Sequence, residues 1–119
     1  MTPLLTVEHV QQGTVCIAPH GDLDLETAYD FDEEVRRIQH TGPETLVVDL
    51  RDVNFIDSAG LGRLVALARR GKRMGERVCF VRGSRALTRL FTLTGVGHGI
   101  EWVRTPDEAI GGRGEAPAG

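Results

Sequence analysis

The sequence lacks a long hydrophobic run and lacks early positive charge. Its longest purely apolar run, residues 64–68, is far shorter than the ~20 residues that a membrane-spanning helix needs. No lysine or arginine precedes Arg36, so the charged start of a secretory signal peptide is missing. We therefore expect no membrane span and a cytoplasmic location.

Cysteine is scarce as well, and the two cysteines lack the spacing of structural sites. Cys16 and Cys79 form no CxxC pair and belong to no Cys/His pattern. This argues against a disulfide scaffold and against a structural zinc site. We expect two reduced thiols in a hydrophobic core and no metal.

The chain has the size and composition of one globular domain. Of its 119 residues, 40% are hydrophobic and 26% are charged, which is near the globular average and leaves too few residues for a second core. Residues 111–119 contain no large apolar side chain. We expect a domain over residues 1–110 and a flexible C-terminal tail over residues 111–119.

Charge is distributed unevenly. The net charge is -3, but residues 1–57 hold twelve acidic and three basic residues, whereas residues 58–119 hold eleven basic and five acidic ones. The acidic block, as we call residues 22–34, contains the carboxylates of Asp22, Asp24, Glu26, Asp30, Asp32, Glu33 and Glu34. We expect this block and the arginine-rich stretch at 63–89 to be solvated helix faces. Because carboxylates repel phosphates, nucleic acid is not the expected partner.

Strand-like and helix-like segments alternate along the chain. Short runs rich in β-branched residues predict five strands, at residues 4–10, 15–18, 45–50, 77–82 and 100–103. Apolar residues at spacings of three and four predict helices that begin at Asp24, at Asp57-Ser58 and at Ser84, with a last helical turn after Pro106. Asp24 or Thr27 is expected to cap the first helix. The first two strands form a hairpin, and Gly21-Asp22 ends the second strand.

This order predicts an α/β fold in which helices pack on a small mixed, mostly parallel sheet of about five strands. The run TLVVDL at residues 45–50 is typical of a strand buried on both faces, so we expect it at the centre. In such sheets the loops after strand ends carry function. The loops of interest are residues 21–24 and 56–60.

Ser58 is the most conspicuous candidate site residue. It stands where a helix N-cap is expected, directly after Asp57, and the alternatives are a nucleophile or a phosphorylation site. A hydrolase nucleophile elbow needs glycine two residues before the serine, and Ile56 occupies that position. No histidine has a positional tie to Ser58; the four are His9, His20, His40 and His98. We therefore expect no enzyme activity.

Two phosphate-handling alternatives fit poorly. Asp49 stands near the end of the central strand, as a phosphoaspartate would in a receiver domain, but that chemistry needs a metal-binding acidic pair and a lysine at a later strand end. Lys72, the only lysine, lies at a predicted helix end. Neither GxxxxGK[ST] nor a complete GxGxxG occurs, and the glycine-rich stretch 95–99 is interpreted as a loop bend. We expect no cofactor.

Three motifs together resemble the STAS domain family. They are VVDLRDVNFIDSAGLGRLVAL at residues 47–67, GDLD at residues 21–24 and RALTRLFTLTGV at residues 85–96. The resemblance extends over residues 4–110 in matching order, and it is specifically to bacterial anti-sigma factor antagonists. The fold that it implies, a small mixed sheet with helices packed on it, agrees with the fold expected above.

The resemblance also implies a function. In these antagonists the serine of the D-S-A-G-L segment is phosphorylated by the partner anti-sigma factor, a serine kinase that resembles a histidine-kinase-type ATPase. The unphosphorylated antagonist binds this partner and releases a sigma factor; phosphorylation breaks the complex, and a serine phosphatase restores it. By position the phosphorylated residue is Ser58. The partner-binding residues implied are Asp24, Asp57, Ser58, Ala59, Gly60 and Leu61.

Other roles of a STAS domain stay open. The domain could be a non-phosphorylated subunit of a lipid-transport ATPase or of a stress-signalling complex, binding a partner through the same face, or it could bind a small ligand. Ala59 stands where many relatives have a second serine, so Ser58 is the only hydroxyl in the segment.

Overall fold

The computed structural model describes residues 5–11, 13–96 and 99–110. The tail predicted at 111–119 and part of the bend predicted at 95–99 lie outside these ranges. The elements, in order along the chain, are β1 (Leu5–Gln11), β2 (Thr14–Pro19), β3 (Gly21–Leu23), α1 (Ala28–His40), β4 (Thr45–Asp49), β5 (Val53–Ile56), α2 (Ser58–Arg73), β6 (Arg77–Val81), α3 (Arg85–Thr94), β7 (Glu101–Val103) and α4 (Pro106–Ile110).

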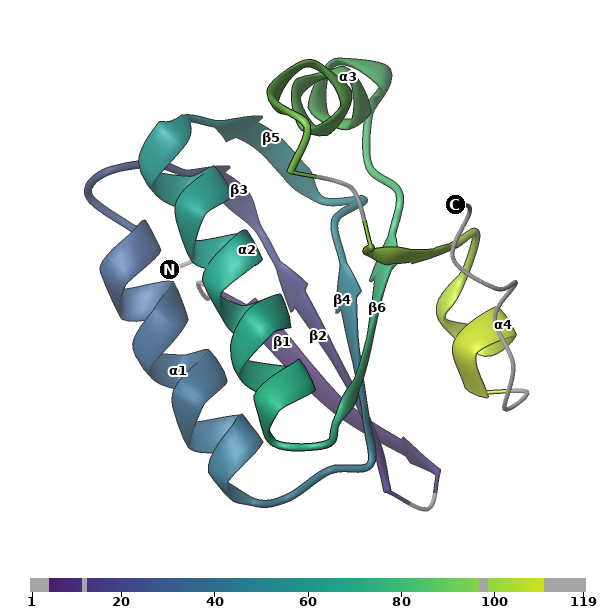
Figure 1. Ribbon diagram of the computed structural model, residues 1–119. Coiled ribbons are helices and arrows are strands. Elements are labelled where there is room, and N and C mark those ends of the chain that lie inside the picture. Colours follow the sequence, from purple (N-terminus) through teal and green to yellow (C-terminus); the bar gives the residue numbers. More distant parts are fainter. Residues whose placement is uncertain (1–4, 12, 97–98, 111–119) are drawn as a thin grey trace.

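Five strands form the main sheet, in the order β1-β2-β4-β6-β7 (Figure 1). β1 runs antiparallel to β2, and the remaining neighbours are parallel. The mixed, mostly parallel sheet and the initial hairpin are thus confirmed. Leu46, Val47 and Val48 of β4 are completely buried, which confirms a central strand covered on both faces.

A separate two-stranded sheet departs from the prediction. β3 pairs in parallel with β5, and Leu23 is aligned with Ile56. The sequence pattern predicts that Gly21-Asp22 ends a strand, and it predicts no strand at residues 53–56. Strands this short show no clear alternation of apolar and polar residues, and their pairing depends on distant segments. The small sheet brings the loop before α1 beside the start of α2.

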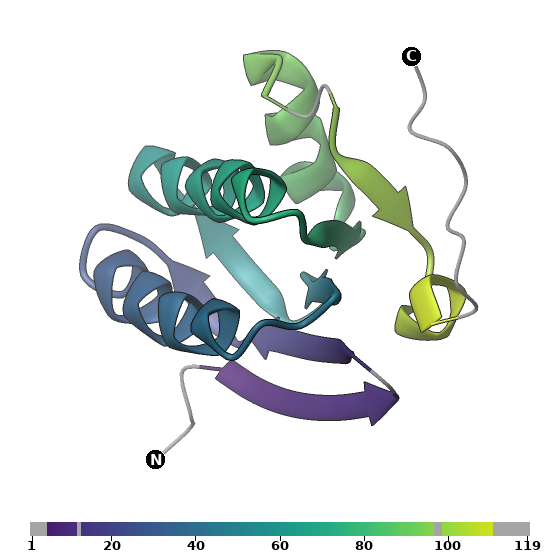
Figure 2. The same cartoon turned by 60° about the horizontal axis from the view of Figure 1, so that its bottom comes forward.

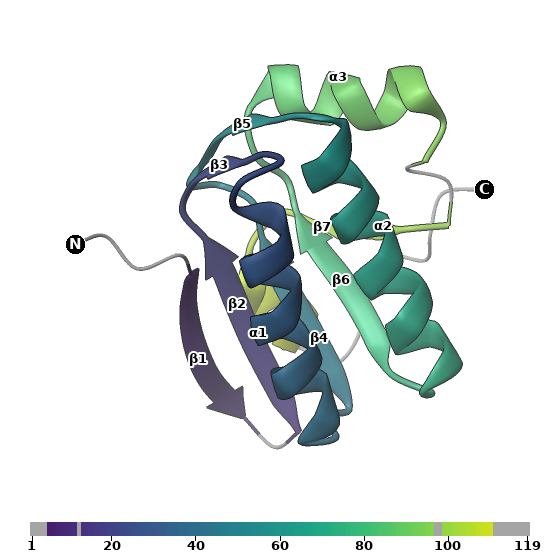
Figure 3. The same cartoon turned by 90° about the vertical axis from the view of Figure 1, so that its left-hand side faces the viewer.

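Helices α1 and α2 lie next to each other over one face of the main sheet (Figures 1 and 2). Phe31 of α1 and Leu64 of α2 are completely buried in the main core, together with Ile17 and Phe80 from the strands. Figure 3 shows α3 at the end of the sheet where α2 begins. In the described ranges, no helix combines the length and the apolar character that crossing a bilayer requires.

The two cysteines lie on the opposite face of the sheet. Cys16 and Cys79 are free and buried, as predicted, in a second core cluster that includes Val47 and Ala109 of α4. Burial raises the pKa of Cys16 to about 11 and that of Cys79 to about 12. Both side chains are therefore protonated thiols at neutral pH, and they react slowly.

A buried polar network joins α1 to α2 and corrects the expectation that the acidic block is wholly solvated. Asp32 is only 3% exposed and accepts hydrogen bonds from Arg36, Arg63 and Arg70, at 3.1, 3.4 and 2.9 Å. Gln39, also buried, accepts a bond of 2.6 Å from Arg70 Nε. The acidic block and the arginine-rich stretch thus meet inside the molecule, because a buried carboxylate requires paired donors.

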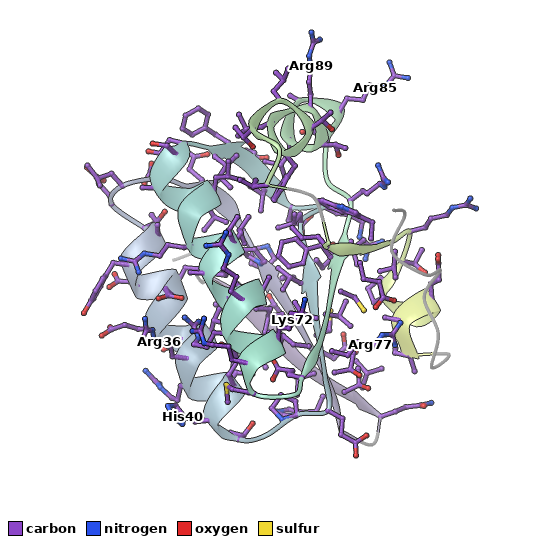
Figure 4. All side chains as sticks on the ribbon, viewed as in Figure 1. Arg36, His40, Lys72, Arg77, Arg85 and Arg89 are labelled. Carbon is purple, nitrogen blue, oxygen red and sulfur yellow. The ribbon has the colours of Figure 1, made fainter. Side chains whose placement is uncertain are left out.

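Arg77 also departs from the expectation, because it lies half-buried on strand β6 and pairs with the carboxylate of Glu101. The arginines of α3 follow the expectation. Arg85 and Arg89 project from α3 into solvent (Figure 4). Ser84 caps α3, as predicted, because its hydroxyl oxygen accepts the N–H of Leu87 at 3.2 Å. Helix α3 therefore has one apolar face on the core and one basic face outside.

Candidate functional site

The start of α2 differs from the prediction in one decisive respect. The N-cap is Asp57, whose Oδ1 accepts the N–H of Gly60 at 3.0 Å. The interpretation of Ser58 as the cap is wrong: Ser58 is the first helical residue and is exposed. Aspartate and serine are equally good caps, so the dipeptide alone left the position ambiguous. Among the described residues, the Ser58 hydroxyl has no hydrogen-bond partner, so it is available to a visiting molecule.

Asp57 also binds the loop that precedes α1. Its Oδ2 accepts the N–H of Leu25 at 3.0 Å, and its own N–H donates to the carbonyl oxygen of Leu23 at 3.2 Å. One carboxylate thus serves two segments that lie far apart in the chain. The two loops singled out from the sequence meet here, and Ser58 follows directly.

Asp24 shapes this loop from within. Its Oδ1 accepts the N–H groups of Glu26 and Thr27, at 3.0 and 3.2 Å. The helix itself begins later than predicted, at Ala28, and Thr27 forms no side-chain cap. Asp24 therefore caps a turn that precedes the helix rather than the helix itself. Asp24, half-buried, and Asp57 lie on neighbouring segments.

Gly60 and Leu61 lie beneath the surface rather than on it. A side chain at Gly60 would overlap the carbonyl oxygen of Leu23 and contact Ile56 at 2.8 Å. Leu61 is 7% exposed and belongs to the main core. These two residues let α2 approach the small sheet closely, which fixes where Ser58 emerges. Ala59, half-buried, lies beside Ser58.

Two exposed apolar side chains lie on the segments that adjoin Ser58, and the sequence pattern identified neither. Leu25 is 79% exposed, and its N–H is the one bound by Asp57. Phe55 is 54% exposed and stands on β5, three residues before Ser58. Large apolar side chains grouped on a surface mark interaction sites. The sequence alone could not show that both side chains point outward.

The charges near Ser58 are mainly negative. Asp57, Asp24 and the exposed Asp22 and Glu26 lie on the adjoining segments. The described residues bring together no group of three metal-ligating side chains. Within the described residues, the site therefore combines an exposed hydroxyl, exposed apolar side chains and carboxylates.

Asp49 has a structural role, as expected. It is 8% exposed and is paired with Arg51, whose Nη2 lies 2.7 Å from Asp49 Oδ2. This bond raises the pKa of Arg51 above its ordinary value. Lys72 lies in the last turn of α2, near the start of β6 rather than at the carboxyl end of a strand (Figure 4). The arrangement of a receiver domain is therefore not formed.

Among the described histidines, none forms a hydrogen bond with Ser58. His20 bonds to Thr6 and lies 3.4 Å from the carboxylate of Asp52. His9 lies on the edge strand β1, and His40 lies at the far end of α1 from the loop that meets α2 (Figure 4). His98 is outside the described residues.

Known proteins resemble this chain in sequence and in fold. The family described as STAS domain matches residues 7–109. The chain is 28% identical over 76 residues to the anti-sigma-B factor antagonist of Staphylococcus aureus, an alignment that covers 64% of this chain and 70% of that protein. An anti-sigma factor antagonist from Mycobacterium paratuberculosis superposes with a TM-score of 0.76 at 28% identity, over 91% of each chain.

The Bacillus cell fate determinant SpoIIAA in its phosphorylated form superposes with a TM-score of 0.70 at 23% identity, over 90% of this chain and 96% of that one. This last likeness concerns the fold alone. The fold expected from the sequence is confirmed, and the family match spans all the elements from β1 to α4. The chain belongs to the STAS domain family.

Proposed function

We propose that this protein is an anti-sigma factor antagonist whose binding to an anti-sigma factor is ended by phosphorylation of Ser58. The observation that carries the proposal is the exposed Ser58 hydroxyl, left unbonded because Asp57 caps α2 in its place. The similarity to antagonists from two bacteria supports the choice of partner. We place the protein in the cytoplasm, where such a partner and its sigma factor would be found.

The phosphoryl transfer needs only an accessible hydroxyl on this chain. The Ser58 oxygen forms a bond to the γ-phosphorus of ATP held by the kinase-like partner, its proton leaves to a base on that partner, and ADP departs. The added group carries about -1.5 to -2 charges at neutral pH. At the first residue of α2 it meets the positive end of the helix dipole. The fold should therefore tolerate phosphorylation.

The partner surface that we propose is built from Ser58, Asp57, Asp24 and Ala59, with Leu25 and Phe55 as apolar contacts. Gly60 and Leu61 position it from below. A partner packed on Leu25 and Phe55 would cover Ser58 and strip water from it. A phosphate there would lie beside two carboxylates and face whatever acidic groups the partner presents.

The electrostatic repulsion between the phosphate and an acidic group of the partner is large enough to end binding. Two unit charges ~6 Å apart in a medium of effective dielectric constant ~20 repel each other by about 3 kcal/mol. Since about 1.4 kcal/mol corresponds to a tenfold change in affinity, one such unit pair weakens binding about a hundredfold, and a dianion more. Salt reduces this repulsion, so the loss of affinity should be largest at low ionic strength. A serine phosphatase that removes the group would restore binding.

The experiment combines purified protein, ATP and the cognate kinase-like anti-sigma factor, with mass spectrometry to locate the phosphate. The chain has one other serine, Ser84, which caps α3 and supplies a matched control. Ser58→Ala should abolish phosphorylation, whereas Ser84→Ala should keep it. A Ser58→Ala protein that still gains phosphate would refute the assignment.

Binding tests the switch separately. Ser58→Asp should weaken the complex, and Ser58→Ala should keep it. A Ser58→Asp protein that binds the partner at full strength would refute the release mechanism. Partner binding that persists while Ser58 never gains phosphate would favour a non-phosphorylated STAS subunit instead.

A further inference from the structure

The edge strand β1 is the longest strand of the sheet and pairs, within the described residues, with β2 alone. Its outer backbone groups are therefore open to another strand. Proteins commonly protect such edges with lysine, proline, short strands or bulges. β1 contains neither lysine nor proline, and its one irregularity lies between His9 and Gln11. The edge over residues 5–9 is regular and carries one carboxylate, Glu8.

An open groove runs between this edge and α1. It encloses about 490 Å³ and is lined by Leu5 and Val7 of β1 and by Asp30, Glu33 and Glu34 of α1. In Figures 2 and 3, α1 lies over the sheet while β1 forms its outer margin. Val7 is 40% exposed. The groove thus has apolar side chains on the strand side and carboxylates on the helix side.

Two of the three carboxylates in this groove lack a counter-charge within the described residues. Glu34 pairs with Arg37 at 2.9 Å, but in the described part of the chain Asp30 and Glu33 form no ion pair. Both are exposed. This contrasts with Asp32, one residue before Glu33, which has three arginine donors.

A second copy of the chain is a poor occupant. Antiparallel pairing of β1 with the same strand of another copy would place the two α1 helices on the same face of a continuous sheet. The carboxylates of Asp30 and Glu33 would then meet their own counterparts across the junction. Like charges placed so oppose association. The groove therefore fits a cationic partner better than it fits a second copy of this chain.

We propose that the groove binds an extended, basic segment of a partner protein, which adds as a strand to the free edge of β1. Backbone hydrogen bonds to residues 5–9 would supply affinity. Because alternate side chains of a strand face the same side, lysine or arginine at every second position would face α1. Their aliphatic stems would cover Leu5 and Val7, and their charged ends would reach Asp30 and Glu33.

The test uses a short acetylated and amidated peptide in which lysines alternate with valines, added to isotope-labelled full-length protein and followed by NMR. Amide signals of residues 5–9 and of residues 30–34 should shift. The Asp30→Asn/Glu33→Gln double variant should bind the peptide roughly five- to twentyfold more weakly, as expected for the loss of two exposed ion pairs. A peptide with glutamate in place of lysine should not bind.

The matched control removes two carboxylates elsewhere. Asp22→Asn/Asp107→Asn changes two exposed residues outside the groove and should leave the affinity within twofold. Ser58→Asp should also leave it unchanged, which separates this surface from the proposed switch. The inference is overturned if the groove variant binds as tightly as the parent protein, or if the shifts occur away from β1. It is also overturned if sedimentation shows a dimer of the unmodified chain that Val7→Lys dissociates, because a second copy would then occupy the edge.

Discussion

Asp57 makes two hydrogen bonds that can be removed one at a time. Its Oδ1 caps α2 through Gly60, and its Oδ2 holds the loop through Leu25, each at 3.0 Å. Asparagine caps a helix about as well as aspartate, but its amide nitrogen cannot accept the second N–H. Asp57→Asn therefore removes the loop bond alone, whereas Asp57→Ala removes both.

The two variants should form a graded series. A single hydrogen bond of this kind contributes ~1 kcal/mol, and an N-cap contributes ~1 kcal/mol. We expect the free energy of unfolding to fall by about 1 kcal/mol in Asp57→Asn and by about 2 kcal/mol in Asp57→Ala, measured by urea denaturation. Ser84→Ala is the control for a cap alone, since its oxygen accepts one N–H, and should cost ~1 kcal/mol.

Limited proteolysis separates the two roles further. The loop at residues 24–27 should be cleaved faster in both Asp57 variants and at the parent rate in Ser84→Ala. If Asp57→Asn were as destabilising as Asp57→Ala, the cap would contribute nothing and the account of the start of α2 would be wrong. If Asp57→Asn were as stable as the parent, the bond to Leu25 would be without effect.

Three further results are expected. Gly60→Ala should lower the free energy of unfolding by about 1–3 kcal/mol in urea denaturation, because the alanine methyl group would meet the backbone oxygen of Leu23 and the overpacked helix must shift. An unchanged denaturation midpoint would contradict this close approach. Burial raises the pKa of Glu76 above its usual value near 4.5, so the free energy of unfolding should fall as pH rises through the raised pKa. The Glu76→Gln protein should be as stable as the parent at pH 4 and more stable at pH 7. A variant that is equally stable or less stable than the parent at pH 7 would oppose the reasoning. Cys16 and Cys79 should react with a thiol reagent only as fast as the protein opens; prompt labelling of the native protein would show that they are accessible.

The parts of the fold that the sequence predicts are those governed by local patterns. The β-branched run at residues 45–50 identifies the central strand, and the spacing of apolar residues identifies α1 and α2. Ser84 is correctly recognised as a cap because only one capping residue stands at that helix start. At α2 two capping residues compete, and the outcome depends on the bond between Asp57 and Leu25, which no local pattern contains.

Features that depend on distant contacts were not predicted. β3 and β5 are too short to show a period, and each is a strand only because the other is present. Asp32 resembles its acidic neighbours in the sequence, yet it turns inward because Arg63 and Arg70 meet it from another helix. At the candidate site, Ser58 and the two aspartates follow from motif resemblance. The exposure of Leu25 and Phe55 does not.

Adjacent carboxylates on α1 have opposite fates. Asp32 is enclosed and neutralised by arginines, whereas Asp30 and Glu33, on either side of it, carry unbalanced charge outward. Different positions of this one helix therefore stabilise the fold and remain available to a partner. Basic residues in place of Asp30 and Glu33 would reverse the charge that this helix presents to a partner, without changing Asp32 and its arginines. Such a variant could be matched to an acidic binding segment that the parent protein would not bind.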